Sequence, residues 1–176
     1  MKKIIIVLVV LLGIMIFNKQ SQEVLIPKEA IRFRIIANSD NKKDQEAKLI
    51  VRDKIEKQIT TDLTKSTNRE EARKTLKKNI NNYENIVSKT LKENNLDTDF
   101  SINYGMNYFP EKTYKGVKYE SGDYESLVVT LGNGLGKNWW CVLFPPLCLL
   151  EGEEKQETEE VEYKFFVQEM IEKFFK

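Results

Sequence analysis

The segment from Leu131 to Asn138 has glycines spaced as in phosphate-binding loops. Glycine recurs at alternate positions, at Gly132, Gly134 and Gly136. A P-loop would need glycine at position 131 and serine or threonine at 138, where the chain has Leu131 and Asn138. A dinucleotide-binding fingerprint also fails, because Lys137 occupies its last small position and no βαβ unit follows. The glycines instead predict a loop with backbone freedom that another surface can approach closely.

Residues that usually carry catalysis or bind metals are scarce in this chain. It contains no histidine, which excludes histidine-based triads and most metal sites. Paired carboxylates could serve a glycosidase, and two pairs lie close in sequence, Asp97 with Asp99 and Asp123 with Glu125. Such pairs arise by chance in a chain with 27 acidic residues. We therefore expect no catalytic residue, no metal and no cofactor.

The segment Leu131–Cys148 contains both tryptophans, both cysteines and two of the four prolines. It is too short and too interrupted to cross a membrane, which takes about 20 apolar residues. Two interpretations are open. In the first, it is a buried final strand and turn with Trp139 and Trp140 in the core. In the second, it is a rigid, partly exposed aromatic loop that docks on a partner, since tryptophan is enriched at interface hot spots.

Cys141 and Cys148 are the only two cysteines of the chain. In an oxidising compartment such a pair can close a small loop as a disulfide. Buried free thiols, acting as small apolar side chains, are the alternative. Two sulfurs without histidine do not favour a zinc site. The sequence favours the disulfide and does not exclude the alternative of two free thiols.

The first residues have the layout of an export signal. Met1-Lys2-Lys3 is basic, and the uncharged apolar run Ile4–Phe17 follows. This run is short for a spanning helix but typical of a signal peptide. Because no small-x-small cleavage motif follows, residues 1–21 are predicted to be a signal peptide or a short N-terminal anchor. The formal net charge of +1 argues against a nucleic-acid binder, which would carry a basic face.

Residues 31–35 alternate apolar and basic side chains, which predicts a half-buried strand. Arg32 and Arg34 then lie on one face. Solvation or local ion pairs are the common explanation for such a face, and contact with an acidic partner is the other.

Two amphipathic helices are predicted next. The turn formers of residues 37–41 precede a helix whose apolar residues recur every four positions up to Leu63. A second helix is predicted to begin at the capping box Thr67-x-x-Glu70 and to end at residues 94–95. A short loop joins them, so they form an antiparallel hairpin whose apolar stripes need a sheet to cover.

Strands are predicted in the second half of the chain. The alternation from Phe100 to Tyr104 predicts a strand, and residues 105–110 read as a turn-rich break. Residues 114–119 and 124–131 flank residues 120–123, which predicts a hairpin with a four-residue loop. The second of these strands buries one face through Leu127, Val129 and Leu131.

This order of elements predicts an α+β fold: a mainly antiparallel β-sheet of about four strands packed by a two-helix hairpin. The predicted organisation is a signal peptide or anchor (1–21), an α+β domain (22–150), an acidic linker (151–161) and an amphipathic C-terminal helix (162–176). Acidic and basic side chains mix on the polar face of that last helix. It is therefore expected to dock on protein, either this domain or a partner, rather than on a membrane surface.

Two stretches resemble a known family. They are IPKEAIRFRIIANSDNKKDQEAKLIVRDKI (residues 26–55) and YGMNYFPEKTYKGVKYESGDYESLVVTLGNGLGKNWWCVLFPPLC (residues 104–148). Both are similar to the stage II sporulation protein R family of endospore-forming bacteria, and the tail VEYKFFVQE is similar too. The most specific part is GxGxGxNWWCVLFPPLC. Residues 119–122 depart from the family, which more often has Tyr-Pro-Ala-Gly there.

The resemblance implies a signalling protein rather than an enzyme. Members are made in the forespore and exported into the space between the two septal membranes. There they trigger a membrane-embedded aspartic peptidase of the mother cell, stage II sporulation protein GA, which removes the pro-sequence of sigma-E. The expected partner is thus that peptidase, without nucleic acid or cofactor, and membrane contact is expected only through the N-terminal segment.

We expect the exported domain to bind the extracytoplasmic face of the peptidase and to favour its active form, since a ligand shifts an equilibrium only by binding one state more tightly. The expected contacts are Asn138, Trp139, Trp140, Phe144, Pro145 and Pro146, with Arg32 and Arg34 as weaker candidates. Two alternatives are an exported cell-wall hydrolase that uses paired carboxylates, and a membrane-surface adaptor that binds through the C-terminal helix.

Overall fold

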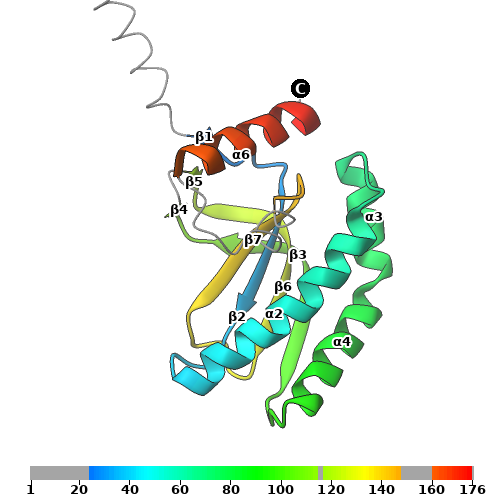
Figure 1. Ribbon diagram of the computed structural model, residues 1–176, viewed down its shortest axis with the longest axis vertical. Helices are drawn as coiled ribbons and strands as arrows, with labels where there is room; N and C mark the ends of the chain where they lie inside the picture. Colours follow the sequence, from blue (N-terminus) through cyan, green and yellow to red (C-terminus); the bar gives the residue numbers. More distant parts are fainter. Residues whose placement is uncertain (1–23, 115–116, 148–159, 176) are drawn as a thin grey trace, which may run out of the picture.

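The computed structural model describes residues 24–114, 117–147 and 160–175. Its elements, in chain order (Figure 1), are β1 (Val24–Leu25), β2 (Ile31–Ile36), α2 (Lys42–Leu63), α3 (Arg69–Lys78), α4 (Ile80–Glu93), β3 (Phe100–Phe109), β4 (Lys112–Tyr114), β5 (Val117–Tyr119), β6 (Gly122–Leu131), β7 (Asn138–Phe144) and α6 (Glu160–Phe175). The predicted signal segment, nearly all of the acidic linker and Cys148 lie outside the described residues. Within the described ranges, no helix is long and apolar enough to cross a membrane.

The larger sheet has four strands in the order β3-β6-β2-β7. β3 pairs with β6 and β7 pairs with β2 in antiparallel orientation, whereas β2 runs parallel to β6. Helices α2, α3 and α4 cover one face of this sheet (Figure 1). The predicted α+β class is confirmed. The sequence predicted a mainly antiparallel sheet and did not predict that β2 and β6 pair in parallel.

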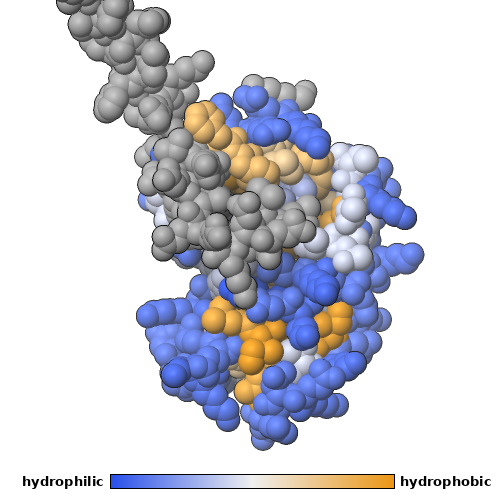
Figure 2. Space-filling view, in the orientation of Figure 1, coloured by the Kyte–Doolittle hydropathy of each residue, from blue (hydrophilic) through white to orange (hydrophobic). Residues whose placement is uncertain are grey.

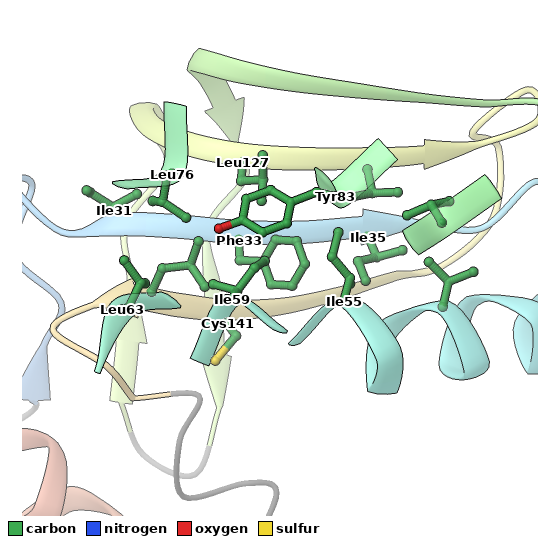
Figure 3. Packing of buried hydrophobic residues seen from close by; sticks show 14 of the residues in the cluster. Ile31, Phe33, Ile35, Ile55, Ile59, Leu63, Leu76, Tyr83, Leu127 and Cys141 are labelled. Carbon is green, nitrogen blue, oxygen red and sulfur yellow. The ribbon is translucent and has the colours of Figure 1, made fainter. Parts of the chain in front are cut away.

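The main core lies between this sheet and the three helices. Alternate residues of the central strand, Ile31, Phe33 and Ile35, are fully buried and point toward the helices (Figure 3). The predicted stripe of α2 meets them, because Val51, Ile55, Ile59 and Leu63 are also buried. β6 contributes the predicted face of Leu127, Val129 and Leu131. Burial of these apolar side chains is the main stabilising term for the domain.

A smaller layer covers the other face of the sheet. β1, β5 and β4 form a three-stranded sheet in the order β1-β5-β4. Together with Val142 of β7 and Val167 of α6, it forms a second apolar cluster. The ring of Phe174 in α6 lies 5.0 Å from that of Phe144. The C-terminal helix therefore docks on its own domain. Figure 2 shows apolar residues along it and a second apolar area on the lower part of the same face.

The predicted hairpin around residues 120–123 is wrong. β5 and β6 flank this turn but belong to different sheets, so the chain crosses from one layer to the other there. The predicted break at residues 105–110 is also wrong, because β3 continues to Phe109. Its ten residues pair with β6 from Phe100 opposite Leu131 to Phe109 opposite Gly122. Gly105 lies within β3 opposite Ser126 of β6, so it does not form the predicted turn.

The second predicted helix is two helices that meet at Asn79, which ends α3 and begins α4. The capping box is displaced by one residue from Thr67 and Glu70. Asn68 is the N-cap, and its side-chain oxygen accepts from the backbone N–H of Glu71 at 2.9 Å. The carboxylate of Glu71 in turn accepts from the backbone N–H of Thr67 at 2.8 Å. These contacts satisfy donors that a helix start would otherwise leave unpaired.

A buried carboxylate ties α3 to β6. Glu125 lies 2.6 Å from Nε of Arg73 and 2.8 Å from Nη2 of Arg69. It also accepts from the hydroxyl of Tyr104 at 2.7 Å. The hydrogen bond from Arg73 is the main cause that lowers the pKa of Glu125 from its ordinary 4.5 to about 2, against the opposing effect of burial.

This lowered pKa gives a pH dependence with a defined sign. Because the folded state holds the charged carboxylate more strongly, its contribution to stability is complete above about pH 4.5 and is lost as the pH falls toward 2. Glu125→Gln should lower the free energy of unfolding at pH 7 by about 2 kcal/mol, since it leaves two arginines without their carboxylate. Urea denaturation across this range should show a shallower pH slope for Glu125→Gln than for the unaltered protein. The exposed control Glu46→Gln should keep the slope, and equal slopes in all three would contradict the assignment.

Candidate functional site

Two loops meet at the end of the sheet where the parallel strands β2 and β6 both stop. The first is the β2–α2 turn (residues 37–41), and the second is the glycine loop (residues 132–137) between β6 and β7. Two backbone hydrogen bonds join them, from Leu135 N–H to Asn38 C=O at 3.1 Å and from Gly136 N–H to Ala37 C=O at 2.9 Å. The Asn38 side-chain oxygen also accepts from Asn133 N–H at 2.9 Å. The other surface that the glycines were predicted to admit is therefore this turn of the same chain.

The glycines are required because the two backbones lie so close together. A Cβ atom at Gly136 would lie 2.3 Å from the backbone oxygen of Ser39. A Cβ atom at Gly132 would lie 2.3 Å from Oδ1 of Asn38. Gly132 and Gly134 also have φ of +53° and +65°, a region that residues with side chains rarely adopt. This geometry explains the alternate glycines without a phosphate ligand.

Asp44, in the first turn of α2, organises the β2–α2 turn. Its carboxylate accepts from Ser39 Oγ at 2.7 Å, from Asn38 Nδ2 at 2.8 Å and from Asn41 Nδ2 at 3.0 Å. The hydrogen bonds from Ser39 and Asn38 are the main causes that lower the pKa of Asp44. Asn41 caps the helix by accepting from the backbone N–H of Asp44 at 2.8 Å. The turn is thus held in one conformation before the glycine loop packs on it.

Two further polar contacts join the glycine loop to this turn and to α2. The backbone N–H of Lys137 donates to Oδ1 of Asp40 at 2.7 Å. The ammonium group of Lys48, 6% exposed, donates to the carbonyl of Lys137 at 3.0 Å. Lys137 immediately precedes β7, so these contacts fix where that strand begins.

The two tryptophans of β7 lie on opposite faces of the sheet, and both are partly exposed. Trp139 packs against the main core, with its ring 5.6 Å from that of Phe33. Trp140 faces the other layer, with its ring 5.3 Å from that of Phe109. Within the described residues, the buried Nε1 of Trp140 has no hydrogen-bond partner. The segment is therefore an edge strand rather than a free loop, with one tryptophan committed to each side.

Arg32 was expected to be solvated or in a local ion pair on the strand surface. Its side chain is instead buried, with 1% exposure. Its guanidinium carbon lies 3.3 Å from the ring centroid of Tyr124 and 5.4 Å from that of Phe109. Arg34 is partly exposed and lies 4.7 Å from the Phe109 centroid. Desolvation lowers the pKa of both arginines. The face of β2 that carries Arg32 and Arg34 was predicted to meet water or form ion pairs with carboxylates. The second layer covers this face instead, and the arginines pack against aromatic rings.

The remaining expected contact residues differ in exposure. Asn138 and Pro146 are partly exposed, whereas Phe144 and Pro145 are buried. The peptide bond between Phe144 and Pro145 is cis. Cys141 is 7% exposed and disulfide-bonded. Its expected partner Cys148, the only other cysteine, lies outside the described residues, so the pairing itself stays a prediction.

The polar side chains of this site are held mainly by contacts within the chain. Ser39 donates to Asp44 and has no histidine to activate it. Within the described ranges, no cluster of three or more metal-ligating side chains occurs. Leu135 at the tip of the glycine loop is 80% exposed, and β7 follows it directly. Sequence reasoning missed Asn38, Asp44 and Lys48. The only signal for them was the cluster of turn and N-cap residues at 37–41.

The described residues form an α+β domain that presents an aromatic edge strand beside two interlocked loops. Residues 27–154 match the family model of stage II sporulation protein R. The chain is 41% identical over 148 residues to stage II sporulation protein R of Bacillus subtilis (strain 168). The aligned region covers 82% of this chain and 66% of that protein, so the chain spans slightly less than two thirds of its relative's length. No solved structure matches the chain.

The chain belongs to the stage II sporulation protein R family, and its role is in sporulation.

Proposed function

We propose that this protein is an exported signal that activates the membrane-embedded aspartic peptidase of the mother cell, stage II sporulation protein GA, and so starts processing of pro-sigma-E. It acts as a protein ligand without catalysis of its own. The N-terminal segment directs export from the forespore into the intermembrane space. The domain then binds the extracytoplasmic face of the peptidase and favours its active form.

The observation that carries this proposal is the edge position of Trp140. The indole is partly exposed, and its N–H has no acceptor within the described residues. That Nε1 atom is itself buried, so the exposed part of the indole ring is the surface that a partner contacts. Leu135 adds exposed apolar surface just before the strand. Tryptophan beside such a surface is typical of interface hot spots.

The test is processing of pro-sigma-E in a non-sporulating host that also expresses the peptidase and the exported form of this protein. Trp140→Ala should lower the amount of processed factor at least about tenfold, the effect of removing one hot-spot side chain. Phe165→Ala is the matched control, because Phe165 is a large apolar side chain that is 63% exposed and belongs to α6 rather than to β7. It should leave processing unchanged.

Trp140→Phe keeps an aromatic ring against Phe109 but offers less exposed ring surface to a partner, so it should lower processing less than Trp140→Ala does. Circular dichroism melts of each variant establish that the domain is folded. Trp139→Ala is a poor probe, because Trp139 packs on Phe33 in the core. A folded Trp140→Ala protein that supports full processing would contradict the contact. Processing that does not depend on this protein at all would contradict the function.

A further inference from the structure

Strand β3 is an open edge without the usual protection. Within the described residues it pairs only with β6, so its other side is free along ten residues. Natural edge strands are normally guarded by charged side chains, prolines or bulges. The sequence of β3, FSINYGMNYF, has no charge and no proline, and its register with β6 is continuous. Figure 3 shows β3 as the outermost strand beside β6.

The second half of β3 also exposes large apolar side chains. Met106 is 67% exposed and Tyr108 is 60% exposed. Tyr104, Met106 and Tyr108 are each two residues apart, so all three side chains lie on the same face of β3. This is the face of the sheet on which the helices pack. An extended segment that added to this edge would cover both exposed side chains.

A basic pocket lies beside these residues. It has a volume of about 270 Å³ and is lined by Arg69, Arg73, Lys77, Tyr104, Gly105, Met106 and Glu125. Glu125 is the only acidic group in this lining, and both arginines and Tyr104 already bind it. Lys77 is exposed and forms no ion pair in the described part of the chain. Glu70, outside the lining, also pairs with Arg73, so three cations meet two carboxylates and the pocket keeps a net positive charge.

We propose that β3 binds an extended segment of a partner protein that carries an acidic side chain between apolar residues. The segment adds to the sheet as a fifth strand through backbone hydrogen bonds. Neighbouring strands lie about 4.8 Å apart, so its alternate side chains reach the same face as Met106 and Tyr108. The acidic side chain then lies at Lys77 and the arginines, and its apolar neighbours cover the two exposed residues.

The charge of the pocket selects this occupant over a second copy of the chain. A β3–β3 pair would supply no acidic side chain, because β3 contains none. It would also bring two basic pockets to one edge. This inference goes beyond the proposed function, since β3 and the tryptophan strand β7 are opposite edges of the sheet.

The probe is the fluorescent eight-residue peptide Val-Thr-Glu-Thr-Val-Thr-Val-Thr. In a strand, its valines and its glutamate lie on one face and its threonines on the other. Its binding to the full-length protein in mild detergent is followed by anisotropy. One control peptide replaces Glu by Lys, and another carries N-methyl groups on alternate amides, which remove the hydrogen bonds of one edge. The parent peptide should bind, the Lys peptide should bind about tenfold more weakly, and the N-methylated peptide should not bind.

The matched protein variants are Lys77→Glu, in the pocket, and Lys78→Glu, an equal charge change on the same helix turn but outside the pocket lining. Lys77→Glu should weaken binding of the Glu peptide and strengthen binding of the Lys peptide. Lys78→Glu should change the binding of neither peptide. Both residues are exposed, so both variants should fold. Equal binding of all three peptides would overturn the proposal. No binding of any peptide, together with self-association of the protein in sedimentation, would overturn the proposal and favour a second copy as the occupant.

Discussion

Gly136→Ala should lower the free energy of unfolding by about 3 kcal/mol, the upper end of what overpacking a close contact costs. The added Cβ would lie 2.3 Å from the backbone oxygen of Ser39 and 2.9 Å from Cβ of Ala37. A backbone atom cannot rotate away, so the two loops must separate and break the hydrogen bond from Gly136 to Ala37. Urea denaturation followed by circular dichroism measures the change.

Gly105→Ala is the matched control for this prediction. A Cβ atom there would meet only the side-chain oxygen of Asn103, at 3.8 Å. Gly105 lies within β3, where alanine gives up less backbone entropy on folding than glycine does, so the variant should be neutral or slightly stabilised. Equal stability of Gly136→Ala and Gly105→Ala would show that the loop contact adjusts without cost. The role given to the glycines would then be wrong.

Arg32→Met should raise the free energy of unfolding by about 1–2 kcal/mol, even though it removes a side chain packed on aromatic rings. The guanidinium group is buried, and its Nε and Nη2 atoms have no hydrogen-bond partner within the described residues. Its pKa is lowered, mainly by desolvation, which means that folding disfavours the charged form. Methionine fills a similar volume without a charge to desolvate.

Arg32→Ala separates charge from volume. It removes the charge too, but it leaves a void between the rings of Tyr124 and Phe109, so it should be less stable than Arg32→Met by more than 1 kcal/mol, roughly. Thermal and urea unfolding of both variants check the order. If Arg32→Met is instead less stable than the unaltered protein, the attraction between cation and rings exceeds the cost of desolvation.

Local sequence signals located the secondary structure but not the partners of each strand. The alternation of residues 31–35 predicted β2, and the four-residue spacing predicted the stripe of α2 that packs on it. Neither signal specifies that β2 lies between β6 and β7, because that pairing depends on contacts between distant parts of the chain. The turn at residues 120–123 looked like a hairpin for the same reason. A short polar loop between two strands does not reveal that they enter different sheets.

The candidate site was predictable in its residue types and not in its geometry. Alternate glycines correctly indicated close approach by another surface, but the identity of that surface required the fold. Arg32 was misplaced because a basic residue on a strand face usually meets water, and only the second layer shows that rings cover it. Trp139 and Trp140 were treated as one unit. Adjacent residues of a strand point to opposite faces, so the two side chains have separate roles.

The position of β2 at the centre of the sheet affects when the domain can fold. β2 comes early in the chain, yet both of its neighbours come near the end of the described residues, with Arg32 opposite Ser126 and Val142. Contacts this distant in sequence raise contact order and slow folding. When only the N-terminal two thirds of the chain have emerged from the ribosome, helices α2, α3 and α4 can form. The four-stranded sheet cannot form yet, because β6 and β7 are still missing. The proposed export requires an unfolded chain, and this topology would delay folding, because the central pairing is complete only after β7 has emerged.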